Sequence, residues 1–167
     1  FAHFWECNKE ELLTSFDGLS FNFPPEKTKR GWFRGHTWYH CDQSFVEKRR
    51  QFECVQSWVT AEDVEDGDAT LTVYEGSHKL QKEFAEKFNV TEKKDWYKLS
   101  DEEELFYINK GCERVHIKCP KGSMVFWDSR TIHCGTEPIK QRKEQNLRNV
   151  VYVCMKPRKY ATEANLR

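Results

Sequence analysis

The chain has 167 residues, and its 27 basic and 27 acidic side chains cancel. This length suits one hydrophobic core, so we expect a single domain over residues 1–167. The neutral balance gives no electrostatic reason to expect nucleic acid as a partner, and no membrane span is expected because no apolar run approaches the ~18 residues that cross a bilayer.

The first predicted element is a short helix over residues 8–16. Asn8 and Glu11 have the spacing of a capping box, in which each side chain hydrogen-bonds the backbone of the other. Two leucines and Phe16 would supply the apolar side of this helix.

Most of the remaining chain reads as strands, because it mixes aromatic and β-branched residues between turn signals such as Asp66-Gly67. The expected strands cover residues 31–42, 52–60, 69–74, 113–119, 123–128 and 147–155.

A helical insertion is expected at about residues 79–109, where the period of the apolar residues changes. Phe84 and Phe88 continue a four-residue spacing that starts at Leu80, which indicates one face of a helix. Ser100, with a glutamate three positions later, has the pattern of a second capping box. Such an insertion is a natural lid or specificity element.

The order of these elements is strands, a helical insertion and then more strands. This order favours a mainly β domain with peripheral helices over a βαβ series. We therefore expect a double-stranded β-helix, the jelly roll of cupin-like proteins.

Seven cysteines are spread along the chain, without a Cys-x-x-Cys pair of the kind that builds a structural zinc site. Reduced thiols in an intracellular compartment are the plain interpretation, so a cytoplasmic location is expected. We expect the protein to be a monomer.

The candidate chemistry starts at His40 and Asp42. On an extended chain these two side chains project from the same face, because side chains alternate with a period of two. An imidazole and a carboxylate side by side can occupy two adjacent positions around a metal ion. Alone the pattern is weak, since any His and Asp two residues apart match it.

A third candidate ligand, His133, follows an apolar stretch and precedes a glycine. On an extended chain Trp127, Ser129 and Thr131 would share the face of His133. Two histidines and one carboxylate on one side of an ion are typical of non-haem Fe(II) oxygenases, with the other positions open for oxygen and a cosubstrate.

Arg148 opens the last predicted strand and is a candidate receptor for an acid. A guanidinium at the mouth of a buried strand needs an anionic partner, and its fork matches a carboxylate. The far carboxylate of 2-oxoglutarate would supply one, while a salt bridge at the strand start is the structural alternative. Arg142 is a competitor, but it lies in a polar stretch that reads as a loop.

Taken together, these motifs resemble the phytanoyl-CoA dioxygenase-like family of 2-oxoglutarate oxygenases. The resemblance rests on His40-x-Asp42, on the segment that ends in His133, and on Arg148. Residues 56–59, 66–71 and 74–79 are similar to that family's strand, acidic turn and Gly-Ser-His segment.

The resemblance implies a double-stranded β-helix and a hydroxylation that depends on Fe(II) and on 2-oxoglutarate, with release of succinate and CO2. It maps His40, Asp42 and His133 to the iron ligands, Arg148 to the cosubstrate arginine and Trp58 to an aromatic that lines the cosubstrate pocket.

Two further side chains are candidates for the cosubstrate pocket. Gln56 shares a strand face with Trp58, and either reaches the pocket or is a core amide bonded to backbone. The sequence departs from the family at Gly135, where a hydroxyl is often found, and Thr131 or Thr136 is a candidate replacement. Glu75 also replaces the usual proline before Gly-Ser-His.

Other histidines are weaker candidates. His78 reads as a loop residue and His116 as a sheet residue, whereas His36, four residues before His40, could support the centre from behind.

The substrate is expected to be a small organic molecule, a lipid-like acyl group or a peptide side chain. The alternative functions are a cupin-like metal-binding module without oxygenase activity, a zinc hydrolase that uses the same three ligands, and a degenerate oxygenase fold used for protein interaction. Arg148 separates the hydrolase from the oxygenase, because a zinc hydrolase has no need of it.

Overall fold

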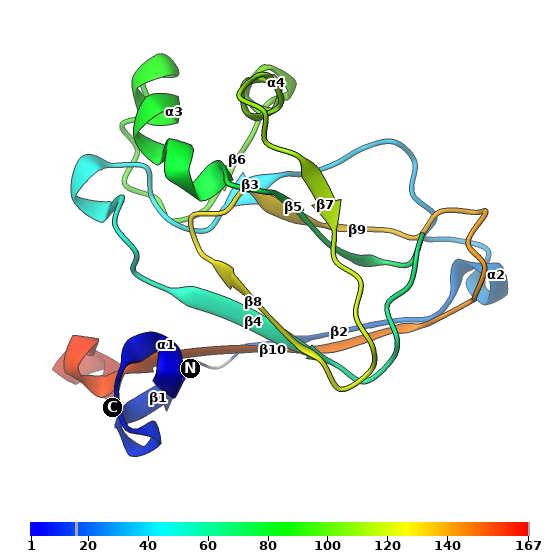
Figure 1. Cartoon of the computed structure of the whole chain (residues 1–167), viewed down its shortest axis with the longest axis horizontal. Coiled ribbons are helices and arrows are strands. Elements are labelled where there is room, and N and C mark those ends of the chain that lie inside the picture. The colour runs from blue at the N-terminus through cyan, green and yellow to red at the C-terminus, as the bar shows by residue number, and fades with distance from the viewer. Residues whose placement is uncertain (16, 167) are drawn as a thin grey trace.

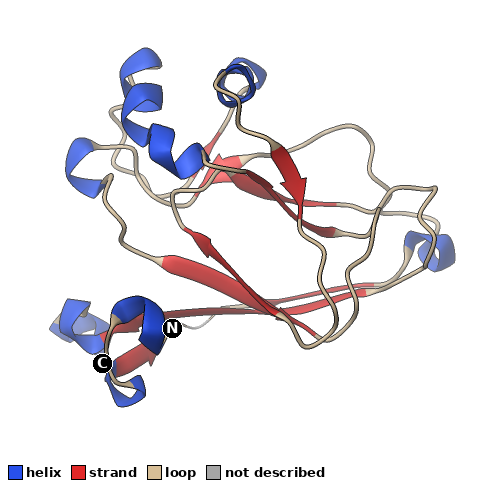
Figure 2. Cartoon of the chain, viewed as in Figure 1, coloured by secondary structure: helices blue, strands red, loops and turns tan. Residues whose placement is uncertain are grey.

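The computed structural model describes residues 1–15 and 17–166, and two antiparallel sheets form its centre (Figures 1 and 2). The first sheet has the order β1-β10-β4-β8, with β2 also paired to β10. Its strands are β1 (Leu12–Thr14), β2 (Leu19–Asn22), β4 (Val55–Thr60), β8 (Met124–Asp128) and β10 (Arg148–Pro157).

The second sheet has the order β6-β3-β9-β5-β7 and lies opposite the first in Figure 1. Its strands are β3 (His40–Cys41), β5 (Thr70–Tyr74), β6 (Tyr97–Lys98), β7 (Arg114–His116) and β9 (His133–Thr136). Consecutive strands β4 and β5, and likewise β8 and β9, lie in different sheets. This crossing confirms the predicted mainly β, jelly-roll fold.

Helices lie at the periphery of the two sheets. The α-helices are α1 (Ala2–Trp5), α2 (Pro25–Thr28), α3 (Gln81–Lys87) and α4 (Asp101–Asn109). Short 3-10 turns are η1 (Lys9–Glu11), η2 (Glu47–Arg49), η3 (Ser77–Leu80), η4 (Arg158–Tyr160) and η5 (Glu163–Leu166). Within the described part of the chain, no helix has the length and apolar character that a membrane crossing requires.

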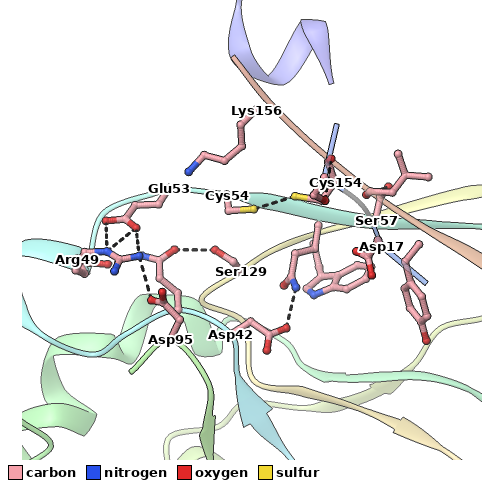
Figure 3. Close-up of a pocket in the computed structure, with 16 residues that line it drawn as sticks. Asp17, Asp42, Arg49, Glu53, Cys54, Ser57, Asp95, Ser129, Cys154 and Lys156 are labelled. Carbon is pink, nitrogen blue, oxygen red and sulfur yellow. Dashed lines mark hydrogen bonds and ion pairs between the residues drawn. The ribbon is translucent and has the colours of Figure 1, made fainter. Parts of the chain in front are cut away.

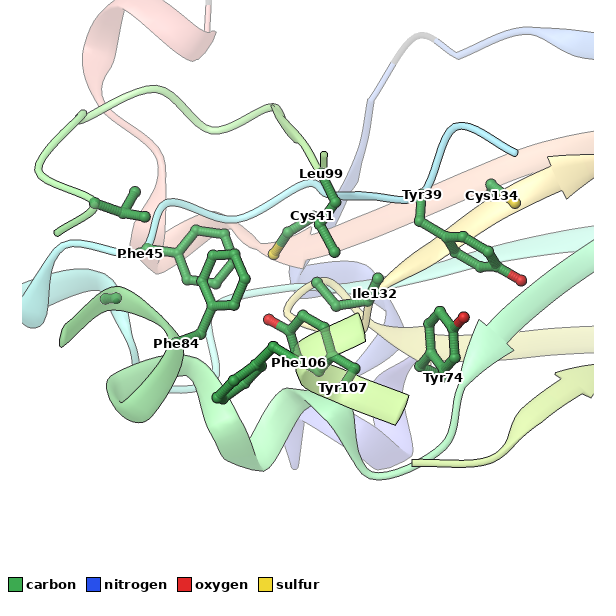
Figure 4. Close-up of a cluster of buried hydrophobic side chains, with 12 residues drawn as sticks. Tyr39, Cys41, Phe45, Tyr74, Phe84, Leu99, Phe106, Tyr107, Ile132 and Cys134 are labelled. Atoms are coloured by element: carbon green, nitrogen blue, oxygen red, sulfur yellow. The ribbon is translucent and has the colours of Figure 1, made fainter. Parts of the chain in front are cut away.

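The larger buried cluster fills the space between α3, α4 and the second sheet (Figure 4). Phe84 of α3 and Tyr107 of α4 are fully buried and stack at 5.2 Å between ring centroids. Cys41 and Cys134, from β3 and β9, point into the same cluster. The neighbours of these cysteines along the strands therefore face the opposite side, between the sheets.

A smaller cluster lies between the two sheets. It contains Trp58 of β4, Val150 of β10, Leu71 of β5 and Val64. Only these four buried hydrophobic side chains form it, against twelve in the cluster under the helices. The candidate site also lies in the space between the sheets.

The predicted helix over residues 8–16 is wrong. The Asn8–Glu11 capping contact is present, with the Asn8 amide donating to Glu11 Oε2 at 2.9 Å, but it opens only a 3-10 turn. The chain then becomes strand β1, because residues 12–14 pair with the end of β10. Phe16 lies outside the described residues.

The predicted strand over residues 31–42 is also wrong for most of its length. Only His40 and Cys41 belong to a strand, and residues 31–39 are irregular. Their backbone is held by isolated hydrogen bonds, such as the one from the Phe33 amide to the Pro138 carbonyl at 2.9 Å. Aromatic residues that suit strands serve here as packing residues of a loop.

Candidate metal centre

His40 and His133 face each other across the pair of strands β3 and β9. They are register partners, and their ring centroids lie 4.3 Å apart. Both side chains are buried, at 6% and 5% exposed. The same alternation that turns Cys41 and Cys134 toward the helices turns these two imidazoles toward the first sheet.

Asp42 follows β3 directly and completes a group of three. Its Oδ1 lies 3.4 Å from His40 Nε2, and its Oδ2 lies 3.4 Å from His133 Nε2. One ligand atom from each residue lies within 4.8 Å of the other two, so the group could hold a metal ion. Adjacent ligands of an octahedral ion bound at about 2.1 Å lie roughly 3 Å apart, so the spacing suits a small divalent ion.

The backbone sets which nitrogen of each imidazole faces the centre. His40 Nδ1 lies 3.2 Å from the Trp38 carbonyl, and His133 Nδ1 lies 2.9 Å from the Thr131 carbonyl. Since a carbonyl only accepts, each Nδ1 donates to the backbone, and Nε2 is the ring atom that faces Asp42 and the centre.

Gln56 on β4 holds the carboxylate from the opposite sheet, its Nε2 donating to Asp42 Oδ2 at 2.7 Å. Burial alone would raise the pKa of Asp42. The neighbouring His133, His40 and Gln56 side chains outweigh burial and hold the pKa well below its usual range. The carboxyl group is therefore charged near neutral pH and suits a cation.

Indole rings enclose the two imidazoles. Trp38 stacks on His40 with 4.7 Å between centroids and an interplanar angle of 6°, and Trp127 lies 5.5 Å from His133. These contacts fix the orientations of the imidazole rings.

A cavity of about 310 Å³ opens beside Asp42 (Figure 3). Gln56 and Trp127 line it near the centre, and charged side chains that include Arg49 and Glu53 line it farther out. Its wall is therefore largely polar.

A second, larger cavity of about 650 Å³ contains Arg148. Trp38 lines this cavity and stacks on His40 of the centre. Tyr152 lines both cavities.

Arg148 has only neutral partners among the described residues. Its donors reach Ser20 Oγ at 3.2 Å, the Ala69 carbonyl at 3.3 Å and Tyr152 OH at 3.4 Å, all long contacts. Its guanidinium lies 5.9 Å from the Trp58 ring. This half-buried guanidinium therefore has donors that are available to an acidic group.

Arg142, the competing arginine, already forms ion pairs with two carboxylates of the protein. Its side chain is 1% exposed and donates to both oxygens of Glu26, at 2.8 and 2.6 Å, and to Asp68 at 2.7 Å. These bonds tie the loops of Arg142 and Asp68 to helix α2, which contains Glu26, so the ion pairs of Arg142 are structural.

Three buried polar atoms around the centre have no hydrogen-bond partner: Gln56 Oε1, Trp58 Nε1 and Trp127 Nε1. Unpartnered buried groups cost about 1–3 kcal/mol each in a folded protein. Two of the three are donors, and a ligand with acceptor oxygens between the sheets would satisfy them.

A sequence model described as phytanoyl-CoA dioxygenase (PhyH) matches residues 2–140. The chain belongs to the phytanoyl-CoA dioxygenase family. The match covers the crossing of the two sheets and all three residues of the centre, and this confirms the resemblance seen in the sequence.

One curated relative of this family member is the Ava biosynthesis cluster protein O of Aspergillus versicolor. It is 29% identical over 175 residues, which cover 99% of this chain and 53% of that protein. The chain thus spans about half the length of this relative.

Solved structures share the fold at low sequence identity. AviO1 from Streptomyces viridochromogenes Tue57 has a TM-score of 0.54 at 16% identity, covering 96% of this chain and 56% of that one. EvdMO1 has a TM-score of 0.53 at 17% identity, covering 86% and 27%. EctD from S. alaskensis with bound Fe has a TM-score of 0.50 at 14% identity, covering 84% and 46%.

The expectation of one extended face from Trp127 to His133 is wrong. Strand β8 ends at Asp128, the chain turns at 129–131, and β9 begins at His133 in the other sheet. The Thr131 amide closes this turn on the Asp128 carbonyl at 2.9 Å. Thr131 contacts the centre through its carbonyl, and its side chain is absent from the described lining of both cavities.

The other sequence candidates lie outside the group of three. His116 Nδ1 meets Thr72 Oγ1 at 3.1 Å within the second sheet. Thr136 is held by the Thr70 carbonyl at 3.2 Å, although it lines the cavity of Arg148.

Sequence reasoning missed the stacking of Trp38 on His40 and the place of Tyr152 between the cavities. The available signals were a tryptophan two residues before His40 and a tyrosine four residues after Arg148 on its strand face.

Proposed function

We propose that this chain is an Fe(II)- and 2-oxoglutarate-dependent dioxygenase, with iron held by His40, Asp42 and His133. The observation that carries the proposal is the meeting of these three side chains beside one cavity, together with Arg148, which lines a second cavity and has no acidic partner among the described residues. Family membership supports it.

The residues fit both groups. Two neutral imidazole nitrogens and one carboxylate oxygen on one side of a site are the donor set that non-haem Fe(II) takes. The Arg148 guanidinium and the unpartnered indole N–H group of the neighbouring Trp58 are donors that suit a dicarboxylate. When bound, iron and 2-oxoglutarate supply the oxidation of a substrate C–H bond, with release of succinate and CO2.

The protein's own residues orient and protect this chemistry. Gln56 fixes the rotation of the Asp42 carboxylate, and the Trp38 and Thr131 carbonyls fix the two imidazoles. Arg148 would receive the far carboxylate of the cosubstrate. The indoles of Trp38 and Trp127 pack against the two imidazoles and hold their ring planes.

Arg148 lines the larger cavity, so we place the cosubstrate there. The substrate then occupies the smaller cavity, beside Asp42. Arg49, Glu53 and Asp95 form an ion-pair network on its outer wall. A volume of about 310 Å³ with this lining suits a small polar molecule or a peptide side chain better than a lipid-like acyl group.

The test measures 2-oxoglutarate binding to the chain loaded with Fe(II) without oxygen, followed by succinate release in air. We expect equimolar binding, and a 10- to 100-fold weaker affinity in Arg148→Gln, because a charge-assisted pair is worth about 1.5–3 kcal/mol. Arg34→Gln, at an exposed loop arginine, is the matched control and should bind normally.

A zinc hydrolase or a simple metal-binding module would give a different result. Either one would bind metal but would show no effect of Arg148→Gln on 2-oxoglutarate and no succinate. That combination would overturn the proposal.

A further inference from the structure

Cys54 and Cys154 are one hundred residues apart in sequence, yet their sulfur atoms lie 3.3 Å from each other. Cys154 is on β10 and Cys54 directly precedes β4, its neighbour in the first sheet. We propose that these two residues form a reversible disulfide by exchange with a low-molecular-weight disulfide such as oxidised glutathione.

The backbone arrangement permits the bond. In the β10–β4 register Cys154 is the partner of Gln56, so Cys54 is its diagonal neighbour. A disulfide needs its sulfur atoms at about 2.05 Å, roughly 1.2 Å closer than they are. Because Cys54 lies just outside the paired strand, rotation of its side chain and a small backbone shift can close this gap.

Reagents can reach the pair. Both cysteines are partly exposed and line the cavity beside Asp42, as Figure 3 shows. The hydrogen bond from the Cys54 thiol lowers the pKa of Cys154 against the opposing effect of burial, while the pKa of Cys54 is raised. Cys154 is therefore the attacking thiolate of the pair.

The other cysteines are poorly suited to this reaction. Cys41 and Cys134 are fully buried under the helices. Among the described contacts, the Cys54–Cys154 pair alone joins two sulfur atoms. The proposal therefore selects one bond among the many that seven cysteines could form.

The exchange balances in two steps. The Cys154 thiolate attacks one sulfur of oxidised glutathione, forms a mixed disulfide and releases the first glutathione thiolate. The Cys54 sulfur then attacks Cys154 Sγ, closes the protein disulfide and releases the second. The two cysteine protons end on the two glutathione thiols, and the protein loses the two electrons that glutathione gains.

The Cys54–Cys154 disulfide would change the wall of the cavity beside Asp42. Gln56, which holds Asp42, is two residues after Cys54 along the chain. The disulfide would tie the start of β4 to β10 beside the Asp42 cavity, so the thiol state sets the shape of that wall.

The experiment incubates the full chain with mixtures of oxidised and reduced glutathione and maps its peptides without reduction. We expect a peptide pair that joins Cys54 to Cys154, loss of two of the seven titratable thiols, and full reversal by dithiothreitol. The melting temperature should rise by several degrees on oxidation, as a crosslink that closes a long loop predicts.

Two serine variants complete the design. Cys54→Ser should abolish the crosslink and stop at one glutathione on Cys154, whereas Cys112→Ser, at a cysteine remote from the pair, should leave the crosslink intact. Absence of the linked peptide, or bonds between chains in its place, would overturn the proposal. Neither readout requires iron or 2-oxoglutarate, so the result is independent of the proposed activity.

Discussion

Gln56 donates its amide hydrogen to the same Asp42 oxygen that faces His133, at 2.7 Å from the amide nitrogen and 3.4 Å from the imidazole nitrogen. Gln56 belongs to the first sheet, and the three candidate ligands belong to the second sheet or directly follow it. The hydrogen bond is therefore a link between the sheets as well as a support for the carboxylate.

Removal of this link should weaken metal binding. In Gln56→Leu the carboxylate loses its orienting donor, and we expect the affinity for Fe(II) or Co(II) to fall about 10- to 100-fold, the usual cost of losing such a support. Gln51→Leu, at an exposed glutamine, is the control for titration by absorption or calorimetry. An unchanged affinity in Gln56→Leu would show that Asp42 needs no support from β4.

The loss of His133 should abolish metal binding, since two remaining ligands hold a divalent ion poorly. We expect His133→Ala to carry no iron after desalting, while His116→Ala retains an equimolar amount because His116 contacts only the second sheet. Metal content by mass spectrometry, with circular dichroism as a check on folding, measures both. Iron retained by His133→Ala would place the centre elsewhere.

The packing of α3 should dominate the stability of the helical insertion. Phe84 is fully buried and contacts five other aromatic rings. Phe84→Ala should lower the free energy of unfolding by about 3–5 kcal/mol, as deletion of a buried phenyl ring does. Leu105→Ala on α4, whose side chain is 53% exposed, should cost less than about 1 kcal/mol in the same urea titration.

The ion pair of Glu26 and Arg142 should make folding stability depend on acid pH. The hydrogen bonds of Arg142 lower the pKa of Glu26 below its ordinary 4.5 and outweigh burial. A carboxyl group whose pKa is depressed by folding stabilises the protein fully above its unfolded pKa, and this contribution is lost as the pH falls.

Glu26→Gln tests this dependence. We expect the variant to be less stable than the natural chain at pH 7, and the difference to shrink as the pH falls below about 4.5. Thermal melts from pH 3 to pH 7 measure it. A difference that is constant over this range would assign the effect to packing instead of charge.

The sequence predicted the parts of this protein that depend on short-range rules. Side-chain alternation placed His40 beside Asp42, the spacing of apolar residues located α3, and the capping box of Ser100 and Glu103 located the start of α4. The type of fold followed from the order of strands and turns. Each of these inferences uses residues a few positions apart.

The misplaced elements depend on partners far away in the chain. Leu12 is in a strand because Pro157 pairs with it, and no residue near position 12 indicates that pairing. The turn before His133 arises from the crossing between sheets, which a local pattern of extended residues does not reveal.

The choice between the two arginines shows the same limit. Sequence alone described Arg142 as a loop residue and left the role of Arg148 open between a ligand and a salt bridge. The deciding facts are the carboxylates of Glu26 and Asp68, 116 and 74 positions from Arg142. Partner assignments of this kind require the folded chain.

Most of the apolar packing of this protein lies behind the second sheet, where α3 and α4 cover it, and only a minor share lies between the sheets. Folding and chemistry thus draw on opposite faces of the same strands. Side chains of the first sheet that line the Asp42 cavity, such as Tyr152 of β10, can be exchanged while the helical side keeps the scaffold assembled, which makes β10 a practical target for engineering.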